Sequence, residues 1–244
     1  MHSTNQVAKT GDIESLQRMM LSPDFQWKPD TTATAACHGQ LEFLKFAHEH
    51  GCHWDLHTCV SAAYGGRLDC LKFAHEHGAP LTSHTTNIAV LNSHLECLKY
   101  AYEKGCPVDE FHSYTAASRS LECLQYLHSI RCPMDVYTAI HAAFEYKLDC
   151  LRFVIENDCL LERKICIALK NHAHKIDLDE HIWLRDQLFS CMKSGVLDQS
   201  DDCKQLYDKC HAKQEEIKLQ KQFALFECNE LPIELVNFIV CEYF

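Results

Sequence analysis

The sequence lacks a long apolar run and a cluster of basic residues. No stretch of about 18 apolar residues occurs, and the opening residues contain no apolar core, so we expect neither membrane insertion nor secretion. Lys and Arg together number 23 against 34 Asp and Glu, which gives a formal net charge of −11. Nucleic-acid binding requires a basic face that neutralises phosphates, so this balance argues against a nucleic-acid partner.

What the sequence does contain is a repeat about 27 residues long. Copies of the segment from Leu68 to Gly78 begin at Leu41, Leu95, Leu121 and Leu148, with a degenerate copy at Ile13. Successive starts are 28, 27, 27, 26 and 27 residues apart. A fixed period of this length is typical of a solenoid, in which no unit buries its own apolar face and each stacks on its neighbours.

Each unit is predicted to contain two short helices. The second helix begins at the leading aliphatic residue, and its apolar positions, such as Leu68, Leu71 and Ala74, recur with helical period. The first helix carries two small apolar residues that allow close approach to its neighbours. These pairs stand at 7–8, 35–36, 62–63, 89–90, 116–117 and 142–143.

Threonine and glycine are expected at the helix ends. A Thr hydroxyl can cap the start of the first helix in four units, at Thr31, Thr58, Thr85 and Thr138. Six of the eight glycines recur at two positions where the backbone must turn with positive φ, namely Gly11, Gly39, Gly66, Gly51, Gly78 and Gly105. Arg131 and Asp158 replace the glycine in the later units, so we expect those units to be less regular.

Half of the 16 cysteines occupy two positions of the repeat. They are Cys70, Cys97, Cys123 and Cys150 at one position, and Cys52, Cys106, Cys132 and Cys159 at the other. Phe43 and Ala79 stand at the same positions in other units, which a disulfide framework would not tolerate. We therefore interpret these thiols as small buried hydrophobic groups, reduced in an intracellular, cytoplasmic setting.

Motifs of catalytic and metal sites are absent. No Gly-x-Ser-x-Gly elbow, phosphate-binding glycine loop or His-Glu-x-x-His occurs, and no two cysteines are closer than seven positions. The histidine clusters, His48 with His50 and Cys52, His75 with His77, and His172 with His174, invite a zinc hypothesis. Tyr102 occupies the repeat position of His48 and His75, which favours packing. The sequence thus predicts no enzyme, metal or cofactor, with an active site in residues 162–244 left open.

This order of features resembles ankyrin repeats over residues 1–161, as six helix-turn-helix units. The short period and the abundance of Cys and His resemble the shortened repeats of giant DNA viruses and protists. The period falls below the common 33 residues, and the Thr-Pro-Leu-His opening is missing. The resemblance therefore implies an all-α, ankyrin-like helical-repeat solenoid whose units are joined by short connections.

Beyond residue 161 the period is lost. Residues 162–228 are predicted to form a helical C-terminal extension that caps the solenoid, with helices near 165–173, 180–193 and 201–228. A terminal helix is predicted in residues 229–244. Its opening, Leu-Pro-Ile-Glu-Leu, resembles the start of an F-box and the C-terminal F-box-like segment of poxvirus ankyrin proteins.

The F-box resemblance implies docking on a Skp1-like subunit of a cullin ubiquitin ligase. The residues that would dock are Leu231, Pro232, Leu235, Phe238 and Ile239. The alternative is that Pro232 begins an ordinary terminal helix that packs on the preceding ones, since Pro is favoured in a first turn. Only nine residues follow Leu235, which is short for a complete F-box.

The function predicted from the sequence is non-enzymatic protein binding by the curved solenoid surface. Variable residues on such a surface are the default binding site. One variable position follows each loop between units, and it holds His57, His84, Phe111 and Tyr137. Aromatic residues at such an edge fit a protein interface. The alternative is an adaptor that also recruits the ubiquitin ligase, and the protein partner is not identified by the sequence.

Overall fold

The computed structural model describes residues 3–28, 30–157, 165, 169, 183–184, 186–187 and 204–212. Internal contacts divide the chain into two units, residues 1–159 and 160–244. Every regular element in the described residues is helical, which confirms the predicted all-α class. None of the described helices is long and apolar enough to cross a membrane.

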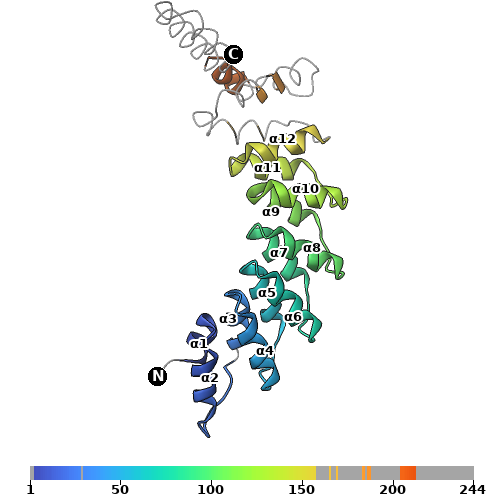
Figure 1. The fold of residues 1–244 in the computed structure, drawn as a ribbon. Helices are drawn as coiled ribbons and strands as arrows, with labels where there is room; N and C mark the ends of the chain where they lie inside the picture. Colours follow the sequence, from blue (N-terminus) through green and yellow to red (C-terminus); the bar gives the residue numbers. More distant parts are fainter. Residues whose placement is uncertain are drawn as a thin grey trace, which may run out of the picture. The chain divides into compact units, whose positions relative to one another are not determined.

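Twelve helices form the first unit, two for each repeat. The first helices of the repeats are α1 (Thr4–Thr10), α3 (Thr31–Cys37), α5 (Leu56–Tyr64), α7 (Ser83–Leu91), α9 (Glu110–Arg119) and α11 (Val136–Phe144). The second helices are α2 (Ile13–Met20), α4 (Leu41–Glu49), α6 (Leu68–Glu76), α8 (Leu95–Glu103), α10 (Leu121–Ser129) and α12 (Leu148–Glu156). First helices pack on one another in chain order, and from α4 onward so do second helices, which gives the predicted solenoid (Figure 1).

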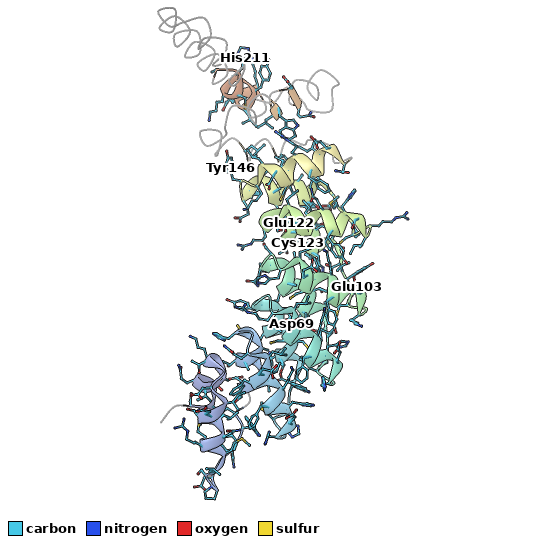
Figure 2. All side chains as sticks on the ribbon, viewed as in Figure 1. Asp69, Glu103, Glu122, Cys123, Tyr146 and His211 are labelled. Carbon is cyan, nitrogen blue, oxygen red and sulfur yellow. The ribbon has the colours of Figure 1, made fainter. Side chains whose placement is uncertain are left out.

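The core of this unit is a column of leucines and small residues. One Leu from each second helix is fully buried, in the series Leu16, Leu44, Leu71, Leu98, Leu124 and Leu151. The predicted pairs of small residues in the first helices are buried as well, with exposures of 0–2%. Burying one Leu contributes roughly 1.5–3 kcal/mol, so this column dominates the stability of the array. Acidic side chains such as Asp69, Glu103 and Glu122 lie exposed on the second helices (Figure 2).

In three units the side chain of an aspartate caps the first helix, not the predicted threonine: Asp55, Asp109 and Asp135. Asp135 Oδ1 accepts hydrogen bonds from the amides of Tyr137 (2.9 Å) and Thr138 (3.2 Å) at the start of α11. Thr138 is the third residue of the helix, and its hydroxyl accepts from the Asp135 amide at 3.2 Å. The Asp135 carboxylate thus accepts from the free amides at the start of the helix, and the Thr138 hydroxyl accepts from the amide of Asp135 in return. This reciprocal pair of bonds is a capping box.

All six predicted turn glycines have positive φ, between 66° and 96°. The later repeats were expected to be less regular, and this expectation is wrong for the repeats up to and including α12. Arg131 adopts the same left-handed conformation with φ of 60°, and Ser93 and Tyr146 do so at the other turn, with φ of 62° and 56°. The packing of the flanking helices imposes the turn even where no glycine relieves its strain. Asp158 lies outside the described residues.

From α4 onward the connections between repeats are short, as the resemblance implied, whereas residues 21–30 form a longer connection between α2 and α3. Residues 50–55, 77–82, 104–109 and 130–135 join the later repeats without a strand. In the second compact part of the chain, residues 160–244, the described residues are helical, and Ile165, Leu169, Leu184 and Leu206 are buried. The remainder of the predicted extension lies outside the described residues.

Candidate protein-binding surface

The four residues predicted to bind a partner stand at one structural position. His57, His84, Phe111 and Tyr137 are the second residues of α5, α7, α9 and α11, and all four are exposed. Phe111 is 62% exposed and Tyr137 is 50% exposed. Because α5, α7, α9 and α11 pack side by side in this order, these residues form a row along the starts of the first helices.

Two further aromatic side chains join this row at its α9 and α11 end. The Tyr114 ring lies 5.8 Å from Phe111 and 6.2 Å from Tyr137, and it stacks on His141 at 5.5 Å with an interplanar angle of 4°. We call Phe111, Tyr114, Tyr137 and His141 the α9–α11 aromatic patch. Tyr114 and His141 were not among the residues predicted from the sequence, although they fall one helical turn after Phe111 and Tyr137 and helical period could have identified them.

Carboxylates surround this patch. The Tyr114 hydroxyl donates a hydrogen bond to Asp135 Oδ2 at 2.9 Å. Burial, this hydrogen bond and the negative charges of Asp135 and Glu110 raise the pKa of Tyr114 to about 12, so the phenol stays protonated at neutral pH. Asp109 caps α9 and is exposed, as are Glu110 and Asp135. The patch thus combines open aromatic rings with three negative side chains.

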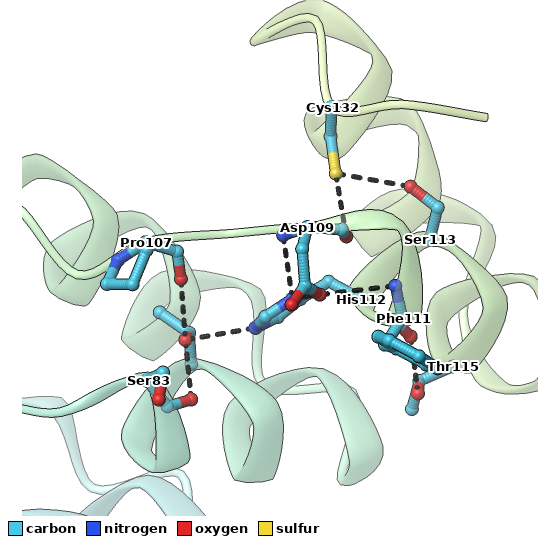
Figure 3. A network of polar contacts seen from close by, with 9 residues as sticks. Ser83, Pro107, Asp109, Phe111, His112, Ser113, Thr115 and Cys132 are labelled. Atoms are coloured by element: carbon cyan, nitrogen blue, oxygen red, sulfur yellow. Dashed lines mark hydrogen bonds and ion pairs between the residues drawn. The ribbon is translucent and has the colours of Figure 1, made fainter.

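A buried histidine anchors the start of α9, next to Phe111 (Figure 3). His112 is 1% exposed and stands where most other units have Thr. Its Nδ1 lies 2.7 Å from Asp109 Oδ1, and its Nε2 lies 3.1 Å from the Thr86 hydroxyl on α7. The Thr86 hydroxyl in turn lies 2.8 Å from the Ser83 carbonyl. These bonds tie the start of α9 to α7, so the patch rests on a rigid support.

The clustered histidines of the second helices are used in packing. His48 stacks on Trp54 at 4.0 Å, and Phe73 lies 4.1 Å from His77. The Trp54 indole donates to the His77 carbonyl at 3.1 Å, which fixes the loop between units. Among the described residues, no group of three or more His, Cys, Asp or Glu side chains could hold a metal ion. His172 and His174 lie outside those residues.

A hollow of about 860 Å³ lies beside α1 and α2, with Thr4, Arg18, Phe25 and Lys28 among its lining residues. It shares no residue with the predicted row. The predicted ligase-docking residues, Leu231, Pro232, Leu235, Phe238 and Ile239, lie outside the described residues. Docking on a ligase and packing as a terminal helix therefore both stay predictions.

Comparison with known proteins supports the fold. No family model matches this sequence, and no curated protein matches it. The structure is similar to the crystal structure of the human ASB11 ankyrin repeat domain, with a TM-score of 0.56 and 16% sequence identity. The match covers 65% of this chain and 84% of that chain. The chain therefore has the fold of an ankyrin repeat domain.

Proposed function

We propose that this protein is a non-enzymatic protein-binding module that holds its partner on the exposed side of the first helices. One observation carries the proposal. Of the seven large hydrophobic side chains exposed in the described residues, six lie on first helices: Leu56, Tyr64, Leu91, Phe111, Tyr137 and Phe144. Exposed apolar groups gathered on one side of a protein mark an interaction surface.

The repeat architecture suits such a role. Each first helix is held by buried small residues and by its neighbours, so the backbone that carries the exposed side chains is positioned before a partner arrives. Binding to a preorganised surface avoids part of the entropy cost of ordering it. The affinity would come from a few desolvated aromatics, because exposed charge pairs contribute little. The ten described cysteines are free thiols, which supports the proposal that the module works in the reducing cytoplasm.

Affinity purification with variants tests the proposal. The full chain is used to capture a partner from native cells, and the purified complex is then measured with the double variant Phe111→Ser and Tyr137→Ser. We expect at least a tenfold loss of affinity with unchanged circular dichroism. Leu21→Ser, which replaces an 84% exposed side chain outside the first helices, is the matched control and should bind normally. Normal binding by the double variant together with loss in exposed second-helix variants would overturn the proposal.

We also propose, as a second candidate, that the chain is an adaptor for a Skp1-like ligase subunit. The Leu-Pro-Ile-Glu-Leu sequence beginning at Leu231 supports this role. The short, Cys- and His-rich repeats support a viral or protist source, in which case the captured partner would be a host protein. Deleting residues 229–244 should abolish co-purification of the ligase subunit while leaving partner binding intact. Loss of the soluble fold would instead support a packed terminal helix.

A further inference from the structure

We propose that the α9–α11 aromatic patch docks an arginine side chain from a basic segment of the partner protein. This inference rests on the proposed protein-binding function and specifies the chemistry of the partner at one place on the surface. It follows from three observations: the exposed side chains of Phe111 and Tyr137, the fixed carboxylates beside them, and the placement of the basic side chains of this chain elsewhere.

The rings supply the first part of an arginine site. Phe111 and Tyr137 are exposed, and both rings lie against the half-buried ring of Tyr114. A guanidinium group is planar and weakly hydrated, so it stacks on aromatic faces more readily than an ammonium group. Such cation–π contacts add roughly 0.5–1 kcal/mol at exposed sites and more when water is excluded.

The carboxylates supply the second part. Asp109 Oδ1 lies 3.2 Å from the Phe111 amide and 2.7 Å from His112 Nδ1, so capping fixes the position of this carboxylate. Asp135 is fixed in the same way by the start of α11 and by the Tyr114 hydroxyl. The Glu110 carboxylate receives no hydrogen bond from the described residues. Its oxygens remain able to accept the planar N–H groups of a guanidinium, beside the carboxylates of Asp109 and Asp135.

The third observation is the position of the basic side chains of this chain. On the second helices and the loop after α8, Lys72 and Lys104 lie over the Tyr100 ring at 5.9 and 5.5 Å, and Lys99 lies over Tyr126 at 6.0 Å. Phe111 and Tyr114 have no such cation among the described residues. The single Lys or Arg within α9 and α11 is Arg119, the last residue of α9, at the opposite end of that helix from Glu110. A partner would therefore supply the positive charge that these rings and carboxylates lack.

A peptide selection tests this inference. Displayed random 12-residue peptides are selected on the full chain, and the affinity of the enriched peptides is measured by fluorescence polarisation. We expect enrichment of arginine. Replacing the critical Arg by citrulline, which keeps the shape and removes the charge, should weaken binding at least tenfold, and replacing it by Lys should weaken binding less.

Matched protein variants assign the binding to the patch. The double variant Glu110→Gln and Phe111→Ala should lose at least tenfold in affinity for the arginine peptide, and it should bind the citrulline peptide as weakly as the wild type does. The control is Tyr102→Ala with Glu103→Gln, which removes a half-buried aromatic and the adjacent exposed acid on the second helix α8. This control should bind the arginine peptide normally.

The outcomes separate this inference from the proposed function. Peptides without basic residues, or arginine peptides that bind the Glu110 and Phe111 variant normally, overturn the arginine site. If such peptides depend on Tyr64, Leu91 or Phe144 instead, protein binding by the first helices still stands. If no peptide is enriched, or if no first-helix variant changes the binding of any peptide or captured partner, both fail.

Discussion

Buried thiols recur at equivalent positions of this core. Nine of the ten described cysteines are buried, and burial raises the pKa of Cys70 and Cys97 to about 11 and that of Cys59 to about 12. A thiol reacts as the thiolate, so these side chains should be inert at neutral pH. They act as small apolar groups that complete the packing between units.

Site-resolved alkylation checks this interpretation. With iodoacetamide at pH 7.5, Cys59, Cys70 and Cys97 of the native protein should stay unmodified, whereas the partly exposed Cys37 should react. In denaturant all four should react at similar rates, because burial no longer suppresses the thiolate. Rapid labelling of Cys70 in the native protein, measured by mass spectrometry of its peptide, would contradict the burial of this repeat position.

His48 makes part of the array sensitive to acid. Burial against Trp54 and the nearby charge of His77 lower the pKa of His48 below its ordinary value of 6.5, although Glu49 opposes the shift. The unfolded chain therefore takes up this proton at a higher pH than the folded chain does. As pH falls through 6.5 and then through the lower pKa of the folded state, this difference progressively destabilises the fold.

The substitution His48→Tyr isolates this contribution. Tyr102 occupies the same repeat position, so the replacement fits the local packing and carries no titrating imidazole. Between pH 7.5 and pH 5, the variant should lose less unfolding free energy than the wild type does. Urea denaturation at both pH values measures the difference, and equal losses in the two proteins would show that His48 is not the cause.

At the scale of the helix, the turns that end the second helices do not depend on glycine alone. A Cβ at Gly78 or Gly105 would meet no atom within 4 Å, so a side chain there is opposed only by the left-handed backbone. Gly65 is different, because its Cβ would lie 2.0 Å from the Cys37 carbonyl oxygen. That glycine permits the close approach of α5 to the end of α3, a requirement that no repeat position revealed.

The substitution Arg131→Gly should stabilise the array by roughly 0.5 kcal/mol. It relieves roughly 1–2 kcal/mol of left-handed strain at a φ of 60° but costs roughly 0.5–1 kcal/mol of additional backbone entropy. The reverse change, Gly105→Arg, should destabilise by a similar amount, since the two residues share a repeat position. Midpoints of chemical denaturation measure both, and a destabilised Arg131→Gly variant would show that the Arg side chain makes a compensating contact.

At the scale of the whole molecule, stability is distributed among interfaces between successive units. Each described helix packs mainly on its partner and on the adjacent units, so the array behaves approximately as a one-dimensional chain of coupled repeats. A defect inside such an array weakens two interfaces at once.

The substitution Leu98→Ala tests this distribution. Leu98 is fully buried in α8, and its truncation should cost roughly 2–5 kcal/mol through a cavity inside the array. Leu91→Ala on the neighbouring helix α7 is the control, because Leu91 is 43% exposed and its loss should cost much less. Equal effects of the two substitutions in denaturant titrations would contradict the assignment of Leu98 to the central column.

The sequence by itself determined the architecture: the period, the starts of the second helices from Ile13 onward, the buried pairs of small residues and the turn glycines. These features follow from local periodicity, because burial repeats at the same position of every unit. It also indicated the row of exposed residues that includes Phe111 and Tyr137.

The tertiary structure alone decided what surrounds that row. Tyr114 forms a hydrogen bond with Asp135, 21 residues away in the chain, and His112 forms one with Thr86, 26 residues away. Such contacts depend on the exact stacking of one unit on the next, which a repeat pattern does not specify. The physical reason is that the repeat fixes the residues each unit needs for burial, whereas the variable side chains acquire their neighbours only when the units are packed together.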